Sequence, residues 1–238
     1  MNGHDESDAR PQGAPDLPKG RLAGFIRKVM GRLREGPYAK RVSVGLRRDV
    51  LEPIMVPTAQ VPVSVRPFVL EDLPWLFPAE DAGGADERAD VRWRLRMAEQ
   101  GALTTHCFVA VDETSNRPCH MQWLTEAGYN AAIRRSGALP VLRSDQVMLE
   151  NAYTPPRYRG MGVMAAVTAL MVERGADFGA RSVVAFVDED NVASLKGACR
   201  VGFTPYTIRV RRQYAYGLLR TARFYPVPAG YAFPHGRL

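Results

Sequence analysis

A short glycine turn, Arg159-Gly160-Met161-Gly162, is the part of this sequence whose residues most clearly suggest chemistry. It separates an apolar run at 147–153 from a helix-like run at 163–178. At a helix N-terminus the first N–H groups lack intrahelical partners and the helix dipole is positive. Glycine allows a ligand to approach the backbone closely, because it has no Cβ. The turn is therefore predicted to bind a phosphate or pyrophosphate, although a tight turn with its arginine in solvent would use the same residues.

A second strand and helix follow. Residues 182–187 (SVVAFV) are typical of a buried strand, and Asn191 to Ser194 open a short helix that stops at Gly202-Phe203. The order strand, PxYRGxG turn, helix, strand, NxxS and helix over 145–205 resembles the GNAT superfamily, whose members transfer acyl groups from acyl-CoA. A weaker resemblance extends back to Val63. The fold expected is α/β, a mixed sheet of about seven strands with a splayed central strand pair, flanked by about four helices.

The resemblance implies that acetyl-CoA or another acyl-CoA binds beside the strand at 145–154. Its pantetheine arm would contact the end of that strand, and its pyrophosphate would contact the N–H groups of the turn. The implied cofactor-binding residues are Ala152, Tyr153, Thr154, Arg159, Gly160, Met161, Gly162, Val163, Met164, Asn191 and Ser194. The family signature can start at Arg157 or, as the neighbouring residues favour, at Arg159. In the second register Met164 departs from the family, which has a small residue there. Asn191 has a second interpretation as the N-cap of its helix, and both roles are compatible.

The implied reaction is direct attack of a neutral primary amine on the thioester. An alkyl ammonium has a pKa of about 10, so a base must first remove a proton. Glu150, on the strand at 145–154, is the candidate base, with Leu149 and Asn151 expected to face the other side of the pleat. A solvated or ion-paired strand glutamate is the alternative. A strand N–H near Thr154 is the expected oxyanion donor.

The general acid is harder to identify. GNAT enzymes often have a tyrosine seven residues after the helix-opening asparagine, but this sequence has Ala198 there. Tyr153 is a weak candidate for the acid, and Tyr158, Tyr206 or water are alternatives. Cys199 is not expected to be a nucleophile, since no histidine is near it in sequence.

No metal site is predicted. Cys107, Cys119 and Cys199 lack metal-ligand spacing and are expected to be reduced, small buried residues. His106 and His120 do not form a ligand-like pair and are expected to be structural.

Composition divides the chain into four parts. Residues 1–20, rich in Pro, Gly and Asp, are predicted to be disordered. Residues 21–62 are predicted to hold a basic amphipathic helix at 21–34 and an extended connector. The acyltransferase domain is predicted at 63–226, with a C-terminal tail at 227–238.

Within that domain, the patterns predict several elements besides those around the turn. These are a strand from Val63, helices at 71–77 and 88–100, paired strands at 106–112 and 119–124, a long loop at 126–144, and strands at 207–214 and 218–225.

The net charge of +7 comes from one segment, because residues 19–48 carry ten Lys or Arg against a single acid, Glu35. The helix at 21–34 can therefore lie on an anionic membrane surface, or dock on the domain or on a partner. Nucleic acid is not an expected partner, because the rest of the chain is nearly neutral. A homodimer is left open.

The favoured function is a cytoplasmic N-acyltransferase, most simply an N-acetyltransferase, acting on a small-molecule amine. One alternative is a long-chain N-acyltransferase at the inner face of the membrane that uses acyl-ACP or acyl-CoA. Another is an inert acyl-CoA-binding module. The acceptor cannot be read from the sequence. The candidates to bind a carboxylate or phosphate on it are Arg134, Arg135, Arg209, Arg211 and Arg212. The alternating Arg209 and Arg211 could instead form a solvated strand face.

Overall fold

The computed structural model describes residues 36–78, 91–93 and 106–231. These residues divide into two compact units, one with 36–39 and 213–220 and the other with 40–212 and the chain from 221 onward. The predictions of a disordered tail at 1–20 and a basic helix at 21–34 lie outside the described residues, as does most of the helix predicted at 88–100. Residues 91–93 of that helix are helical.

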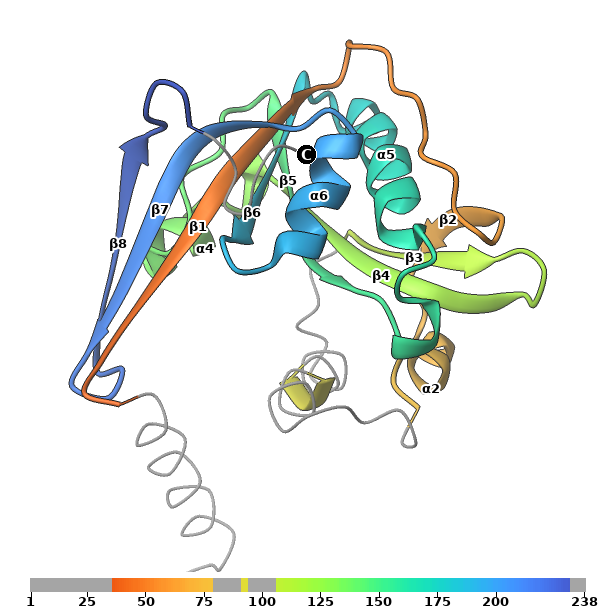
Figure 1. The fold of residues 1–238 in the computed structure, drawn as a ribbon, viewed down its shortest axis with the longest axis horizontal. Coiled ribbons are helices and arrows are strands. Elements are labelled where there is room, and N and C mark those ends of the chain that lie inside the picture. Colours follow the sequence, from red (N-terminus) through yellow and green to blue (C-terminus); the bar gives the residue numbers. More distant parts are fainter. Residues whose placement is uncertain (1–35, 79–90, 94–105, 232–238) are drawn as a thin grey trace, which may run out of the picture. The chain divides into compact units, whose positions relative to one another are not determined.

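The described residues form one mixed eight-stranded sheet in the order β2-β3-β4-β5-β6-β1-β7-β8 (Figure 1). The strands are β1 (Tyr38–Asp49), β2 (Val63–Pro67), β3 (Cys107–Asp112), β4 (Arg117–Glu126), β5 (Gln146–Tyr153), β6 (Ser182–Asp188), β7 (Thr204–Tyr214) and β8 (Leu219–Pro226). The helices are α2 (Leu73–Leu76), α4 (Asn130–Ser136), α5 (Val163–Gly175) and α6 (Val192–Arg200), with short 3-10 turns at Leu70–Asp72, Ala127–Tyr129, Pro156–Tyr158 and Ala176–Phe178. The predicted α/β class is confirmed.

Strand β1 corrects the prediction that residues 36–62 are only a connector before a domain that starts at Val63. It pairs antiparallel with β6 from Ser43↔Asp188 to Asp49↔Ser182, and Val44 and Leu46 are fully buried. Residues 43 to 46 are all buried, as expected for a strand in the middle of a sheet that is covered on both faces. Residues 50–62 do form a connector, and the Gln60 N–H donates to the Met161 carbonyl at 2.8 Å.

Helix α4 corrects the prediction of a loop at 126–144. The Asn130 side chain fixes its start, since its Nδ2 donates to the Leu142 carbonyl and its Oδ1 accepts from the Leu142 N–H, both at 2.8 Å. Ile133 packs with Leu142, Met148 and Val184 under the sheet. The helix ends at Gly137, whose φ of 59° is left-handed.

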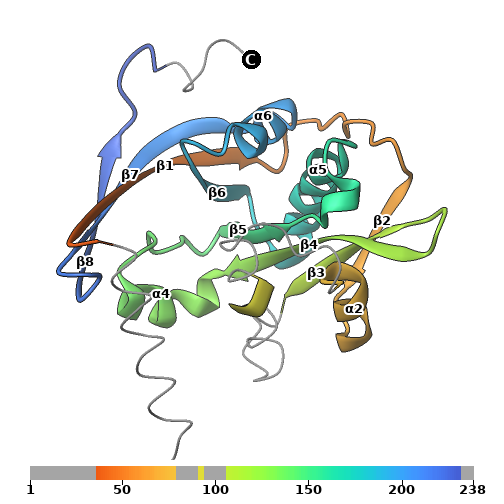
Figure 2. The same cartoon turned by 60° about the horizontal axis from the view of Figure 1, so that its bottom comes forward.

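Two helical layers cover the sheet. Helices α5 and α6 lie on one face, and α2 and α4 lie on the other (Figure 2). The alternation along β3 follows these layers, because Phe108 and Ala110 join the core under α5 whereas Val109 joins the core that contains Leu76 of α2.

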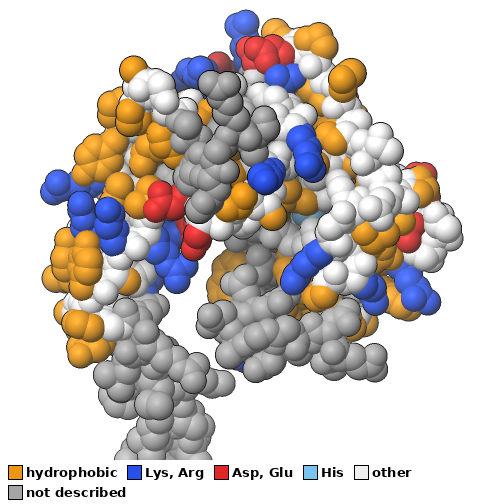
Figure 3. Space-filling view, in the orientation of Figure 1, with side chains coloured by type: hydrophobic (Ala, Val, Ile, Leu, Met, Phe, Trp, Pro, Cys, Tyr) orange, Lys and Arg blue, Asp and Glu red, His pale blue; other side chains and the backbone are white. Residues whose placement is uncertain are grey.

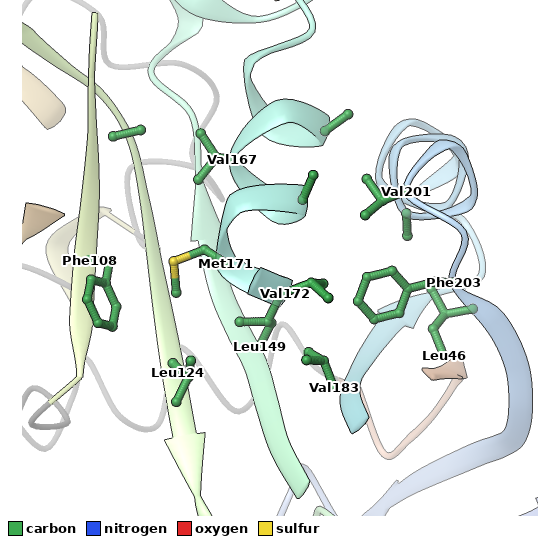
Figure 4. Packing of buried hydrophobic residues seen from close by; sticks show 14 of the residues in the cluster. Leu46, Phe108, Leu124, Leu149, Val167, Met171, Val172, Val183, Val201 and Phe203 are labelled. Atoms are coloured by element: carbon green, nitrogen blue, oxygen red, sulfur yellow. The ribbon is translucent and has the colours of Figure 1, made fainter. Parts of the chain in front are cut away.

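Helix α5 is apolar on most of its circumference because it lies between the sheet and α6. Figure 4 shows Val167, Met171 and Val172 directed at the strands, with Val201 and Phe203 closing the other side. A helix buried on two sides has little amphipathic character.

Contacts between its two segments hold the smaller unit together. The rings of Tyr38 and Tyr214 lie 5.3 Å apart, and the Ala215 N–H donates to the Pro37 carbonyl at 2.9 Å. Ala215 and Tyr216 have left-handed φ values of 48° and 57° in the turn between β7 and β8.

Candidate active site

The parallel pairing of β5 and β6 stops halfway along both strands. It runs from Gln146↔Ser182 to Leu149↔Ala185, although β5 continues to Tyr153 and β6 to Asp188. A cavity of about 360 Å³ lies at this opening. Its lining residues are Gln122, Leu149, Glu150, Asn151, Ala152, Met164, Thr168, Ala185, Phe186, Val187, Asp188, Asn191, Ser194, Ala198, Phe203, Arg209 and Arg211. The predicted splayed central pair is confirmed.

An irregularity in β5 lies where this strand lines the cavity. Glu150 is opposite Trp123 and Tyr153 is opposite Met121, so one extra residue of β5 is accommodated between these pairs. Asn151 adopts a left-handed φ of 53° there. The expectation that Asn151 faces away from Glu150 is therefore wrong, because a bulge breaks the alternation of a strand. Glu150, Asn151 and Ala152 all line the cavity.

The side of the cavity beneath α5 and α6 holds several of the predicted cofactor residues. Ala152, Met164, Asn191 and Ser194 line it. Asn191 Oδ1 accepts a hydrogen bond from the Ser194 N–H at 3.1 Å, so the N-cap interpretation of Asn191 is confirmed. A Cβ on Gly197 would lie 2.1 Å from Met164 Cε, so glycine makes room on α6 for the methionine side chain.

The glycine turn lies directly before α5. Gly160 and Gly162 both have a φ of 78°, and Gly162 is the N-cap of the helix. The first N–H groups of the helix have no intrahelical partner, so they remain available to an anion. The connector packs against the turn, since a Cβ on Gly162 would lie 3.0 Å from the Thr58 carbonyl oxygen. Arg159 is exposed, and its Nε donates to the Thr154 carbonyl at 3.0 Å.

Of the other predicted residues of this region, Met161 packs partly buried against the main core and Val163 is almost fully buried. Their side chains are therefore structural. Any contact they make with a ligand would use the backbone.

Glu150, the candidate base, is half-buried at the cavity wall. Thr125 Oγ1 donates to its Oε1 in a short hydrogen bond. The carboxylate is thus held by a neighbouring strand, in a residue that lines the cavity.

None of the three tyrosines considered as the acid is among the described residues that line the cavity. Tyr153 is buried and packs on Phe77 with ring centroids 4.9 Å apart. Tyr158 is buried and donates to Asp112 Oδ2 at 3.3 Å. Burial raises the pKa of Tyr206 to about 12. Ala198 does line the cavity, at the position where the family often has tyrosine.

His120 has a structural position behind β5. It is fully buried, and its Nδ1 lies 2.7 Å from Thr154 Oγ1. Burial lowers the pKa of His120 to about 4, so the ring is neutral at physiological pH. This contact fixes Thr154, whose side chain, like that of Tyr153, is not among the residues that line the cavity.

The cysteines have the properties of buried thiols. Burial raises the pKa values of Cys107 and Cys119 to about 12 and also raises that of the half-buried Cys199. A thiol with a raised pKa is a poor nucleophile. The remaining histidine of the domain body, His106, lies beside Glu126 and stacks edge-on against Phe178.

A cluster of charged residues also lines the cavity. Arg209 and Arg211 of β7 lie there with Asp188 and Phe186. Arg209 is only 6% exposed, so the interpretation of this strand face as solvated is wrong. Arg212 projects elsewhere and hydrogen-bonds Tyr225.

Several residues of the cavity were not identified from the sequence, and two of them are polar residues in apolar segments. Gln122 lies in the apolar strand CHMQWL and Thr168 in the apolar helix VMAAVTALMV. A single polar residue inside a buried run is the signal that would have found both, since a buried polar group requires a partner.

The fold is similar to that of a solved GCN5-related N-acetyltransferase region. This solved structure, which matches with a TM-score of 0.52, is the glucosamine N-acetyltransferase region of a fungal multi-domain GH3 β-N-acetylglucosaminidase. That structure is 13% identical, and the match covers 89% of this chain and 23% of the fungal one.

Two further solved structures are similar at lower scores. A GCN5-related N-acetyltransferase from Sphaerobacter thermophilus is 15% identical with a TM-score of 0.47, and the match covers 78% of this chain and 55% of that one. A Drosophila protein is 14% identical with a TM-score of 0.47, and the match covers 82% and 58%. The chain thus spans less than two thirds of each of these three proteins. The sequence itself matches no profile of a known protein family and no curated protein.

On the face shown in Figure 3, basic side chains occur at several separate places among hydrophobic and neutral ones. No helix in the described part of the chain is long and apolar enough to cross a membrane. The described residues contain no group of three or more His, Cys, Asp or Glu placed to hold a metal ion.

Proposed function

We propose that this protein is an N-acyltransferase, most simply an N-acetyltransferase, which moves an acyl group from acyl-CoA to a primary amine of a small molecule. The observation that carries the proposal is the early end of the β5–β6 pairing. Beyond Leu149 and Ala185 the two strands no longer pair with each other, and a cavity that is also lined by Met164 and Thr168 of α5 lies there. An extended arm with amide groups suits a strand edge, and a pyrophosphate suits the helix N-terminus.

Glu150 is the proposed base. It removes one proton from the substrate ammonium, and the neutral amine nitrogen then bonds to the thioester carbonyl carbon. The C–S bond breaks, and the departing CoA thiolate takes up the proton that the nitrogen loses. The products are an amide, free CoA thiol and a protonated Glu150, which returns its proton to water.

Calorimetric titration with acetyl-CoA and a longer acyl-CoA tests the binding step. Ser194→Trp places an indole in the cavity wall, whereas Ala193→Trp alters the neighbouring exposed residue, which does not line the cavity. We expect binding to be lost in Ser194→Trp and kept in Ala193→Trp. This pair is preferable to a substitution of Gly162, which would also displace the connector at Thr58.

Glu150→Gln tests the chemical step. The amide can still accept the Thr125 hydrogen bond, so the fold and acyl-CoA affinity should be kept while kcat falls about 10²- to 10⁴-fold. Full acyl-CoA binding with no thiol release from the wild type and any amine would favour a second candidate, an inert acyl-CoA-binding module. Ala198 in the cavity wall, in place of the family's frequent tyrosine, is the observation that supports that candidate.

A further inference from the structure

Two arginines at one end of the cavity each have an unused hydrogen-bond donor. Arg209 and Arg211 are two residues apart on β7, so their side chains share a face, and both line the cavity. The Nε atom of each is buried and has no hydrogen-bond partner among the described residues. Buried donors are nearly always paired in folded proteins, so these two N–H groups indicate a ligand.

The rest of the Arg209 guanidinium is already fixed. Its Nη1 donates to the Ala138 carbonyl at 3.2 Å and its Nη2 to Ser43 Oγ at 3.0 Å, and the Phe186 ring lies 4.7 Å away. Both acceptors are neutral. Burial lowers the pKa of Arg209 to about 10, which still leaves a cation at physiological pH. The result is a rigid, buried cation whose hydrogen-bonded partners carry no negative charge.

Asp188 orients both arginines without occupying the Nε–H donor of either one. It accepts from Arg211 Nη2 at 3.1 Å and from the Ser43 hydroxyl, which in turn accepts from Arg209. One carboxylate thus orients two guanidinium groups through their Nη atoms. The two Nε–H groups remain without an acceptor. The two arginines and one aspartate together carry a net positive charge.

We propose that the acceptor amine carries an oxygen anion, a carboxylate or a phosphate, which binds the Nε–H groups of Arg209 and Arg211 while the amine lies at Glu150. The inference rests on the proposed acyltransferase function and specifies its acceptor. Guanidinium N–H groups bind oxygen anions in short, charge-assisted hydrogen bonds. Glu150 lines the same cavity and acts on Arg209 electrostatically, so an acceptor with an ammonium and an anion would meet a charge of opposite sign at each end.

Matched acceptors test the inference. Thiol release from acetyl-CoA would be measured with the ω-amino acids from glycine to 6-aminohexanoate, each against the alkylamine that lacks the carboxylate, and with O-phosphoethanolamine against ethanolamine. We expect kcat/KM for the best anionic acceptor to exceed that of its neutral counterpart at least about tenfold. The two series distinguish a carboxylate from a phosphate.

Substitutions of the arginines then test whether these residues cause the preference for anionic acceptors. Arg211→Gln, at a half-buried position that tolerates change, should reduce the anionic-to-neutral ratio to about threefold or less, mainly through KM. Arg209→Lys should do the same if it folds, since lysine cannot place a donor where Nε lies. Arg212→Gln, on the same strand but away from the cavity, is the control of equal charge and should keep the ratio of the wild type.

Equal turnover of anionic and neutral amines, or a ratio that survives Arg211→Gln, would overturn the inference while leaving the acyltransferase proposal intact. Failure to bind acetyl-CoA, together with no thiol release from any amine, would overturn both. Direct calorimetric binding of the preferred amino acid to the wild type, lost in Arg211→Gln, would support the inference independently of turnover.

Discussion

The buried histidine behind β5 makes the protein sensitive to acid in a way that can be calculated. His120 is fully buried and its pKa is about 4, compared with about 6.5 for an exposed histidine. Between pH 6.5 and pH 4, His120 is therefore protonated in the unfolded chain and neutral in the folded protein. Stability is lost as the pH falls from 6.5 toward 4. With these two values the loss is about 2 kcal/mol at pH 5 and approaches about 3.4 kcal/mol below pH 4.

Urea unfolding at pH 7.5 and pH 5.0, for the wild type and His120→Gln, measures this term. Other groups titrate in both proteins, so the difference between their pH dependences isolates His120. We expect the wild type to lose about 2 kcal/mol more than the variant. Equal losses in the two proteins would mean that the imidazole is protonated in the folded state, and the account of its burial would be refuted. Since His120 Nδ1 contacts Thr154, acid should also disturb the end of β5.

Two further predictions concern residues that sequence reasoning weighed for catalysis. Tyr158→Phe should lower the free energy of unfolding by about 1 kcal/mol, because it removes one hydrogen bond to Asp112, and should leave kcat unchanged; a large fall in kcat would instead give Tyr158 a catalytic role. With a pKa of about 12, only about 1 in 10,000 molecules carries a thiolate at Cys107 or Cys119 at pH 8. Thiol reagents should therefore modify at most Cys199 in the native protein and all three cysteines after unfolding, and rapid native reaction of two thiols would contradict this burial.

The region around the glycine turn could be predicted because its signals are local. An apolar strand, a glycine pair and an apolar helix follow one another, and each boundary is marked by residues with few alternative conformations. The same holds for Asn191, whose N-cap bond to Ser194 spans three residues.

The parts that could not be predicted depend on contacts distant in sequence. Helix α4 is stabilised by a bond between Asn130 and Leu142, and the bulge at Asn151 appears only when β5 is paired with β4. The burial of Arg209 depends on Ser43 and Ala138, which come from other elements. Alternation along β7 correctly placed Arg209 and Arg211 on one face, but nothing local indicates that this face is covered.

The position of β1 has a consequence for how the chain is made. Ser43 pairs with a residue 145 positions later, and β7 lies on the other side of the strand. At a translation rate of about 5–20 residues per second, β1 waits roughly 7–30 s before its first partner exists. During that time Val44 and Leu46, which end fully buried, have neither of the strands that flank β1 in the folded sheet. A shortened protein that starts after residue 48 would lose this strand from between β6 and β7, so any deletion meant to remove only the N-terminal segment must stop before Tyr38.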